Sequence, residues 1–254
     1  KGVFKAYPLV KGGEILWPGK YKSMEEIEEE KLKAGNDYAF QREYLLNIVP
    51  AEAQAIFREW IHYYDELPVP QKLDKWYTQH VEVRVGIDLA ISKSSTADYT
   101  SMVPGWCLEN KNDEGYTIYI LPKIVNQKLD FPETVEMCKT IYKTYSDTEQ
   151  GINPKLVIED VAYQKSLPQQ LEYEGLHDIK TIRPGNLDKR ARLILTANLI
   201  KTGKVLFPRE GAEELINQLV HFGVEKHDDL ADAFSNLVHS VHEDPPSTCR
   251  IYIF

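Results

Sequence analysis

The stretch VEVRVGIDLAI, residues 81–91, decides the fold, and two stretches of the same kind follow it, YTSMVPGWCLE at 99–109 and GYTIYILPKIV at 115–125. Each is rich in β-branched and aromatic residues, which favour strands. Polar turns such as ENKNDEG, residues 109–115, separate them. We therefore predict three successive strands in an antiparallel meander.

The chain after the meander alternates between helical and strand-like segments. FPETVEMCKTIYKTY (131–145) is amphipathic and predicts a helix, whereas PKLVIED (154–160) predicts a buried parallel strand. The same analysis predicts helices and strands at 167–174 (helix), 178–182 (strand), 187–202 (helix) and 204–208 (strand), followed by two closing helices. A meander followed by alternating helices and strands predicts an α/β fold with a mixed sheet.

Residues 1–78 show helical patterns and lack the strand-like stretches of the part that follows. Ser23 is placed as an N-cap and predicts a helix over 24–48. A second helix is predicted after Pro50, with one face formed by Ile56, Trp60, Tyr63 and Tyr64. The prolines of LPVPQKLDKW end this pattern. We predict a helical region with its linker over 1–78, a second domain over 79–243 and a C-terminal tail over 244–254.

Composition bounds the class of protein. The chain has 254 residues, of which 43% are hydrophobic and 27% charged, as in a soluble globular protein. It has neither an apolar run of about 20 residues nor a signal peptide, so we expect an intracellular protein. Cys107, Cys138 and Cys249 are odd in number and widely spaced, which excludes a disulfide framework or a CxxC zinc site. Since the chain begins at Lys1, we expect it to be a piece of a longer protein.

Charge is unevenly distributed. The net charge at pH 7 is −9, which by itself argues against a nucleic-acid partner. Between Lys180 and Arg209, however, eight basic residues accompany one acidic residue. A basic stripe in an acidic protein is expected where a phosphate-binding surface lies beside carboxylates that hold cations. A solvated helix face would explain the same stripe, and the pattern leaves both interpretations open.

Two strand-like stretches carry candidate catalytic acids. Asp88 lies near the centre of the first stretch, where a buried charge is costly unless it is paired or binds a metal ion. Glu159 and Asp160 end PKLVIED, and alternation sends their side chains in opposite directions, so only one can face a given cleft. We choose Glu159. A hydrogen-bonded structural aspartate and a surface carboxylate at a strand end are the alternative interpretations.

The third candidate acid lies in KHDDLADAF, residues 226–234. Apolar residues from Leu230 to Val241 recur at helical spacing and form a buried stripe. On a wheel of about 100° per residue, Asp229 lies about 110° from the centre of that stripe, and Asp228 and Asp232 lie further toward solvent. Asp229 is therefore best placed to face a cleft, although Asp228 or Asp229 could instead cap the helix.

Oxygen ligands from three elements, without a cluster of cysteine and histidine, suit Mg²⁺ or Mn²⁺ better than zinc. Two such ions about 3.5–4 Å apart would activate a water molecule and stabilise the leaving oxygen in phosphodiester hydrolysis. The acids and the basic stripe together predict a metal-dependent enzyme that acts on a phosphodiester.

The chain resembles a known family, the C-terminal half of tailed-phage large terminase subunits. The resemblance runs from about Tyr7 to Val241 and keeps the order of the motifs, which are ILWPGKYKSMEEIEEEKLKAGNDYAFQREYLLNIVP, GIDLAIS, STADYTSM, VIEDVAYQKSLPQQL, DKRARLILTANLIKTGKVLFP and KHDDLADAFS. It implies an RNase H-like mixed sheet flanked by helices. It also implies an endonuclease that cuts concatemeric viral double-stranded DNA during genome packaging with two divalent ions, Mg²⁺ or Mn²⁺.

The resemblance implies roles for particular residues. Carried over by motif, the catalytic metal ligands are Asp88, Glu159 and Asp229, with Asp98 and Asp228 as auxiliary ligands. In DKRAR, Lys189 and Arg192 match basic positions that face DNA. The further DNA-binding candidates are Arg190, Arg183, Lys165 and Lys93. The loop after the second acid departs from the family, because it holds Tyr163, Gln164 and Lys165 where related sequences often have a glycine.

The resemblance also implies partners: double-stranded DNA, the terminase ATPase domain of the parent chain, the small terminase subunit and the portal protein, all in the host cytoplasm, with no membrane partner. The motor itself is missing. In GEILWPGKY, Gly13 and Gly19 are one residue too far apart for a Walker A loop, and Tyr21 replaces Ser or Thr. We expect no ATP hydrolysis, and residues 1–78 would be the helical tail of the motor region.

Two other functions stay open. GIDLAISKSST, residues 86–96, also resembles the first phosphate loop of actin-like and sugar-kinase ATPases, but their second Asp-Gly-Gly loop and second large domain are missing. The other alternative is a DNA-binding packaging module without cleavage, in which the acids are remnants. Incubation with plasmid and Mn²⁺ separates a nuclease, which nicks the plasmid, from a binding module, which only retards it.

Overall fold

The computed structural model of the chain describes residues 7–11, 13–33, 40, 44–46, 55–70, 72–73, 76–77, 80–90, 99–110, 115–147, 152–159, 166–183, 189–222 and 228–245. Its contacts divide the chain into two compact units, Lys1–Gln54 and Ala55–Phe254. The sequence pattern predicts the domain boundary near residue 78 instead. The limits 1–78, 79–243 and 244–254 stay predictions. Within the described ranges, no helix is both long and apolar enough to cross a membrane.

The first unit contains a short hairpin and a helix. Strands β1 (Val10–Lys11) and β2 (Glu14–Ile15) are antiparallel, and α1 covers Met24–Lys33. The backbone N–H of Glu26 donates to Ser23 Oγ at 3.3 Å, as expected of the predicted N-cap. The helix predicted over 24–48 is too long, because residues 44–46 form a turn and a bend.

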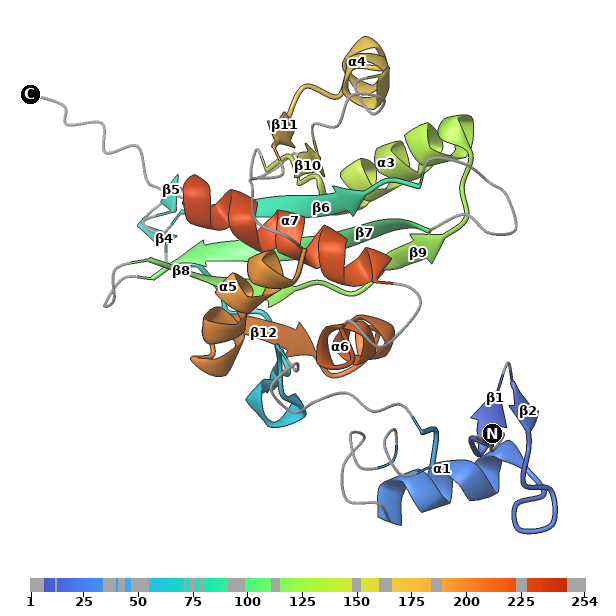
Figure 1. Cartoon of the computed structure of the whole chain (residues 1–254). Helices are drawn as coiled ribbons and strands as arrows, with labels where there is room; N and C mark the ends of the chain where they lie inside the picture. Colours follow the sequence, from blue (N-terminus) through green and yellow to red (C-terminus); the bar gives the residue numbers. More distant parts are fainter. Residues whose placement is uncertain are drawn as a thin grey trace, which may run out of the picture. The chain divides into compact units, whose positions relative to one another are not determined.

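An eight-stranded mixed sheet forms the centre of the second unit, in the order β11-β10-β6-β7-β8-β12-β3 with β9 beside β7 (Figure 1). Its strands are β3 (His62–Tyr64), β6 (Val81–Asp88), β7 (Thr100–Glu109), β8 (Tyr116–Ile120), β9 (Val125–Gln127), β10 (Lys155–Glu159), β11 (Ile179–Ile182) and β12 (Val205–Pro208). β6, β7 and β8 are antiparallel neighbours, which confirms the predicted meander. β10 is parallel to β6 and β11, as predicted for PKLVIED. A separate antiparallel pair joins β4 (Lys72–Leu73) and β5 (Trp76–Tyr77).

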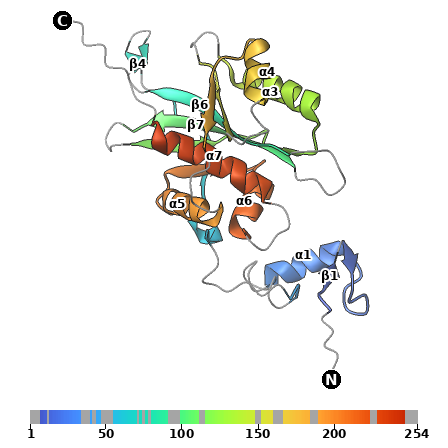
Figure 2. The same ribbon diagram turned by 45° about the horizontal axis from the view of Figure 1, so that its top comes forward.

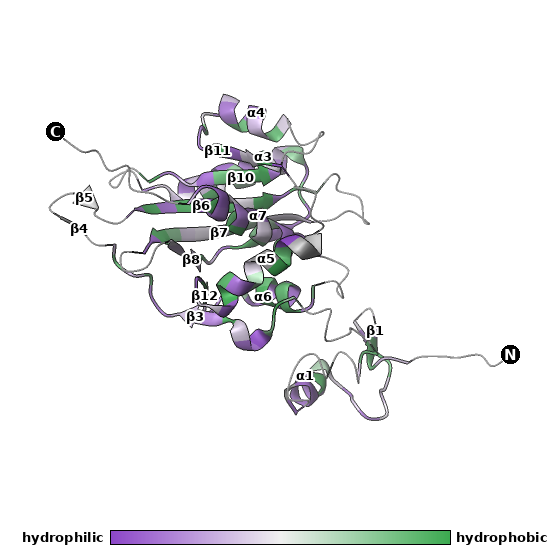
Figure 3. Cartoon of the chain, turned by 60° about the vertical axis from the view of Figure 1, so that its left-hand side comes forward, coloured by the Kyte–Doolittle hydropathy of each residue, from purple (hydrophilic) through white to green (hydrophobic). Residues whose placement is uncertain are grey.

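Helices cover both faces of this sheet (Figure 2). They are α3 (Phe131–Tyr145), α4 (Ser166–Tyr173), α5 (Lys189–Lys201), α6 (Glu213–Val220) and α7 (Asp229–Glu243). α3 and α4 share one core cluster with the sheet, whereas α5, α6 and α7 share another. Figure 3 shows hydrophobic residues on the central strands and on the helices that cover them. The predicted fold class, a mixed α/β sheet flanked by helices, is confirmed.

The helix predicted after Pro50 is wrong. Arg58–Trp60 forms a single 3₁₀ turn, η2, and β3 follows it and pairs in parallel with β12. Tyr64 Oη donates to the carbonyl oxygen of Ile120 at 2.7 Å, which fixes β3 to the sheet. The aromatic spacing fits a helix, but pairing with the edge of β12 satisfies backbone groups that a short isolated helix would hold only weakly.

Glycine at position 86 lets α7 lie directly on β6. A Cβ at Gly86 would lie 2.1 Å from the carbonyl oxygen of Ala233 and 2.6 Å from the backbone nitrogen of Leu237. Because both contacts are backbone atoms, a side chain here would force the helix off the strand. Gly86 therefore sets how closely α7 approaches the sheet.

Candidate active site

Two acids end neighbouring parallel strands. Asp88 is the last residue of β6 and Glu159 the last of β10. Ile87 is paired with Ile158, so the two acids that follow lie level with each other. Both isoleucines belong to the core under α3 and α4, and alternation therefore directs Asp88 and Glu159 to the face covered by α7. The prediction that Asp88 lies near a strand centre is wrong, since it ends the strand and is only partly buried.

The direction of α7 follows from two contacts with β6. Near the end of the helix, Ser240 Oγ accepts a hydrogen bond from Arg84 Nη1 at 3.4 Å. One turn earlier, Asn236 Nδ2 donates to the carbonyl oxygen of Ile87 at 3.1 Å. α7 therefore runs antiparallel to β6, and its first residues lie toward the carboxyl end of that strand.

Asp229 is thereby brought to the end of the sheet where Asp88 and Glu159 lie. It precedes Ala233 by one turn, about 6 Å along the helix axis. Ala233 in turn lies on Gly86, which precedes Asp88 by two residues, about 6.6 Å along the strand. The three acids predicted as metal ligands thus come from three elements and share one end and one face of the sheet.

The start of α7 is more enclosed than a single apolar stripe implies. Asp229 and Asp232 are each only 4% exposed, so the prediction that Asp232 lies toward solvent is wrong. α7 packs on β6 and β7 and also against α5 and α6, which leaves it little solvent-facing surface. Asp228 occupies the N-cap position without a capping hydrogen bond from its side chain, and the N–H of Leu230 instead donates to Gln218 Oε1 at 2.9 Å.

The guanidinium of Arg192 lies between Glu159 and Asp232. Arg192 Nη1 donates to Glu159 Oε1 at 3.1 Å, and Nη2 lies 4.0 Å from Asp232 Oδ1. The side chain of Arg192 is 13% exposed, so it points into the protein, whereas the resemblance implies that it faces DNA together with Lys189. Leu193, Ala197 and Ile200 of the same helix are buried in the core.

A sequence signal for this inward position exists. Arg192, Thr196 and Ile200 are spaced four residues apart and therefore lie along one side of α5. Thr196 and Ile200 are both buried. An arginine that begins a buried stripe is expected to face a carboxylate, because a buried cation is costly without one.

The remaining predicted site residues are placed only in part. Arg183 follows β11 and is exposed, and Asp228 is partly buried. Lys189 and Arg190 lie in the first turn of α5, and their side chains are not described. The candidates that lie outside the described residues are Asp98, Asp160, Lys93, Lys165 and His227.

The donor set fits a hard divalent cation in type, because carboxylate oxygens are the ligands that Mg²⁺ and Mn²⁺ prefer. As the side chains lie, however, no three acidic, histidine or cysteine groups among the described residues are arranged to hold a metal ion. Glu159 is instead directed at Arg192. Asp88, Glu159 and Asp229 therefore lie at one end of the sheet, but their side chains are not arranged around a common metal position.

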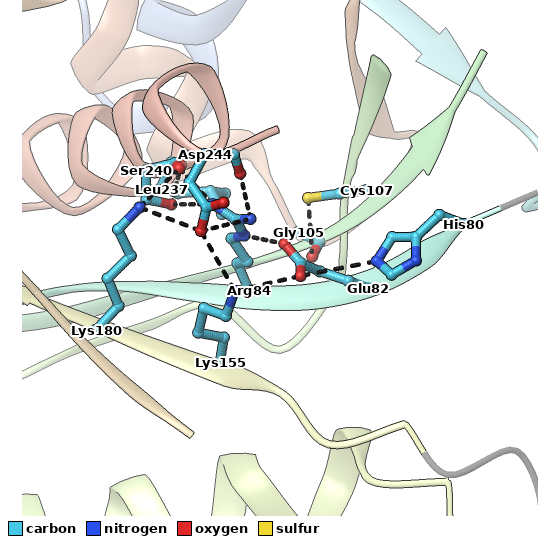
Figure 4. Close-up of polar contacts among 10 residues, drawn as sticks. All are labelled: His80, Glu82, Arg84, Gly105, Cys107, Lys155, Lys180, Leu237, Ser240 and Asp244. Carbon is cyan, nitrogen blue, oxygen red and sulfur yellow. Dashed lines mark hydrogen bonds and ion pairs between the residues drawn. The ribbon is translucent and has the colours of Figure 1, made fainter. Parts of the chain in front are cut away.

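The amino half of β6 holds a fully buried arginine, Arg84, which is 1% exposed (Figure 4). It pairs with the carboxylate of Glu82 and donates to the carbonyl oxygens of Ser240 and Asp244, the last at 2.5 Å. Lys155 Nζ lies 3.4 Å from Glu82 Oε2 and 3.6 Å from Asp244 Oδ2. These contacts fix the last turn of α7 to the sheet.

Glu82 is held ionised in this cluster. Burial alone would raise its pKa, but the hydrogen bond from His80 and the charges of Arg84 and Lys155 outweigh burial and lower the pKa to about 2. Asp244 follows the same pattern, since Lys155, Lys180 and Arg84 lower its pKa although desolvation raises it. Each carboxylate at this end therefore has cationic partners within the protein.

Comparison with known proteins gives a family. The family model for the terminase RNaseH-like domain matches residues 85–240. Among solved structures, the large terminase nuclease from thermophilic phage G20c with bound zinc is 12% identical, with 71% of this chain and 94% of that chain covered and a TM-score of 0.44. The same nuclease with bound cobalt is 12% identical, with coverages of 75% and 98% and a TM-score of 0.48. No curated protein matches the chain.

The matched region begins in β6 and ends in α7, so it contains the strand ends that carry Asp88 and Glu159 and the helix start that carries Asp229. It also contains the meander and the parallel strand β10. Because the match spans more than half of the chain, the protein belongs to the family of terminase RNase H-like domains.

Proposed function

We propose that this chain is a divalent-metal-dependent endonuclease that cuts concatemeric viral double-stranded DNA during genome packaging. The observation that carries the proposal is the position of Asp88 and Glu159 at the ends of adjacent parallel strands, with Asp229 at the start of the helix that covers them. Family membership supports a nuclease role. The acids and the family thus favour the same chemistry.

Each acid has a role in this proposal. Asp88, Glu159 and Asp229 would hold the metal ions, with Asp228 and Asp98 as auxiliary ligands. Two Mg²⁺ or Mn²⁺ ions bound there would activate a water molecule and stabilise the leaving oxygen. In the hydrolysis, the water oxygen bonds to phosphorus, the bond from phosphorus to the leaving oxygen breaks, and that oxygen gains a proton. Burial of Asp229 keeps water from screening these charges.

Basic residues would hold the DNA by its phosphates. The candidates are Lys189, Arg190, Arg183, Lys165 and Lys93, which flank the acids in the sequence. As a part of the packaging machinery, the chain would act with the ATPase domain of a parent chain, the small terminase subunit and the portal protein in the host cytoplasm, and residues 1–78 would connect it to the motor.

The test is cleavage of supercoiled plasmid by the purified chain. We expect nicking with Mg²⁺ or Mn²⁺, none with excess chelator, and recovery when the metal is restored. Ca²⁺ should support DNA binding without turnover, because its looser coordination misplaces the water. If the plasmid is retarded but not nicked with any of these metal ions, the nuclease proposal is wrong. The chain would then be a DNA-binding module without cleavage.

A further inference from the structure

We propose that Arg192 is a positioning residue that holds the carboxylate of Glu159 in the orientation needed to meet a metal ion. The inference rests on the proposed nuclease function and adds to it a residue that touches neither DNA nor metal. It replaces the expectation that Arg192 faces DNA. The basis is the set of contacts that Arg192 makes between three elements of the fold.

Arg192 connects α5 to both β10 and α7. Its guanidinium donates to Glu159 Oε1 at 3.1 Å and lies 4.0 Å from Asp232 Oδ1. Its backbone carbonyl oxygen lies 3.2 Å from Nε2 of His239, two turns further along α7. Both the side chain and the backbone of this residue are therefore fixed, and the end of β10 is tied to the start of α7 through them.

The contact leaves Glu159 able to bind a second partner. Arg192 engages Oε1, and a carboxylate can accept at several lone-pair positions on its two oxygens. An ion pair on one oxygen restricts rotation of the carboxylate. The other oxygen is thereby held in one orientation, in which it could meet a metal ion. Groups that orient metal ligands in this way commonly change metal affinity about 10- to 100-fold when they are removed.

Arginine suits this position better than lysine. Its planar fork can direct Nη1 and Nη2 at two different carboxylates, whereas a lysine ammonium is a single point of charge. Burial strengthens the requirement, because the side chain is 13% exposed and that of Glu159 is 14% exposed. Loss of the guanidinium would leave Glu159 free to rotate within a poorly hydrated site.

A DNA contact is the competing role for Arg192, and the two roles differ in kinetics. When a residue that binds phosphates is removed, the affinity for DNA falls, so KM rises. When a residue that positions a catalytic acid is removed, kcat falls. Metal binding also weakens, and this loss is seen even without DNA. The mostly buried side chain and its bond to Glu159 favour the second role.

The experiment compares Arg192→Gln and Arg192→Lys with the parent chain, and Lys139→Gln serves as the control. Lys139 lies on α3, which covers the opposite face of the sheet, and pairs with Glu136 of the same helix and with Glu174 just after α4. Mn²⁺ affinity is measured by calorimetry without DNA, and plasmid nicking gives kcat and KM. We expect Arg192→Gln to bind Mn²⁺ about tenfold more weakly and to lower kcat with KM unchanged. Arg192→Lys should recover part of both losses, and Lys139→Gln should match the parent.

The outcomes separate this inference from the proposed function. If the parent neither binds Mn²⁺ nor nicks plasmid, the nuclease proposal fails. If the parent does both and Arg192→Gln has the parental Mn²⁺ affinity, or changes KM alone, the positioning role is overturned and the nuclease proposal stands. Circular dichroism checks that the variants fold. Should Arg192→Gln not fold, Arg192→Lys decides the question, and parental Mn²⁺ affinity in that variant overturns the role.

Discussion

Two largely buried arginines, Arg84 on β6 and Arg192 on α5, meet acidic residues near opposite ends of α7, and they are bound very differently. Arg84 lies at the amino half of the strand and bonds to Glu82 and to two carbonyl oxygens at the end of α7. Arg192 donates to Glu159 at the carboxyl end of β10, with Asp232 of α7 at the longer distance of 4.0 Å. Its Nε is buried and finds no hydrogen-bond partner in the part of the chain that is described.

This difference separates a cluster that is paired within the fold from the one that we propose to be functional. Around Arg84, two further cations, Lys155 and Lys180, approach the acids, so both carboxylates are paired within the fold itself. At the other end, acids arrive from β6, β10 and α7, and the arginine among them is incompletely bonded. Incomplete bonding of a buried charge is costly and is retained where function requires it.

The largest expected effect is on catalysis at the acidic end. Asp229→Asn should lower the plasmid nicking rate on the order of 1,000-fold, because the amide is a poor metal ligand and removes a charge from the metal site. The free energy of unfolding without metal should hold or rise, since one of several neighbouring carboxylates loses its charge. Nicking assays and urea unfolding measure the two quantities. A parental nicking rate would remove Asp229 from the site.

The Arg84 end should show the opposite pattern, a loss of stability without a loss of chemistry. Glu82→Gln should lower the free energy of unfolding at pH 7 by about 3 kcal/mol, from the difference between the ordinary pKa of 4.5 and the value of about 2. The variant should nick plasmid at the parental rate wherever it is folded. The control is Glu136→Gln, whose exposed ion pair with Lys139 should contribute less than about 1 kcal/mol.

The pH dependence of that difference follows from the direction of the shift. Because the pKa of Glu82 is lower in the folded protein, its contribution is complete above about pH 4.5 and decreases as the pH falls toward about 2. The gap in urea midpoint between Glu82→Gln and the parent should therefore shrink over this range. A gap that stays constant from pH 7 to pH 3 would mean that the charge of Glu82 does not stabilise the fold.

Local pattern predicted the two strands that carry Asp88 and Glu159, although it placed Asp88 near the centre of its strand and not at the end. These apolar stretches are visible in the sequence because strand formation and burial depend on neighbouring residues. The position of β3 was not predictable in this way, because it depends on the free edge of β12, far along the chain. Long-range pairing overrode the local helical spacing of the aromatic residues.

The inward position of Arg192 and the burial of Asp232 share a physical cause. Both depend on how α5 and α7 pack against each other, and a helical wheel treats each helix as if one face met solvent. The small residues Ala231, Ser235 and Ser240 of α7 allow neighbours to approach on several sides, and all three are buried. Such small residues signal an enclosed helix, and they are the clue by which the burial of Asp232 could have been predicted.

The smallest expected effect concerns the salt dependence of DNA binding, and it sharpens the contrast between Lys189 and Arg192. If Lys189 contacts a phosphate, Lys189→Gln should reduce the magnitude of the slope of log affinity against log salt by about 0.9, equally on two unrelated duplexes. Arg192→Gln should leave the slope unchanged, because its charge is directed at Glu159. Both slopes would be measured with Ca²⁺ to prevent cutting.

Two results would revise this contrast. An unchanged slope for Lys189→Gln would mean that the first turn of α5 is a solvated face, and the DNA path would then be sought at Lys93 and Lys165. A reduced slope for Arg192→Gln would mean that its guanidinium leaves Glu159 to reach a phosphate when DNA binds. In that case the incompletely bonded Nε of Arg192 would be explained by a second, DNA-bound position of the same side chain.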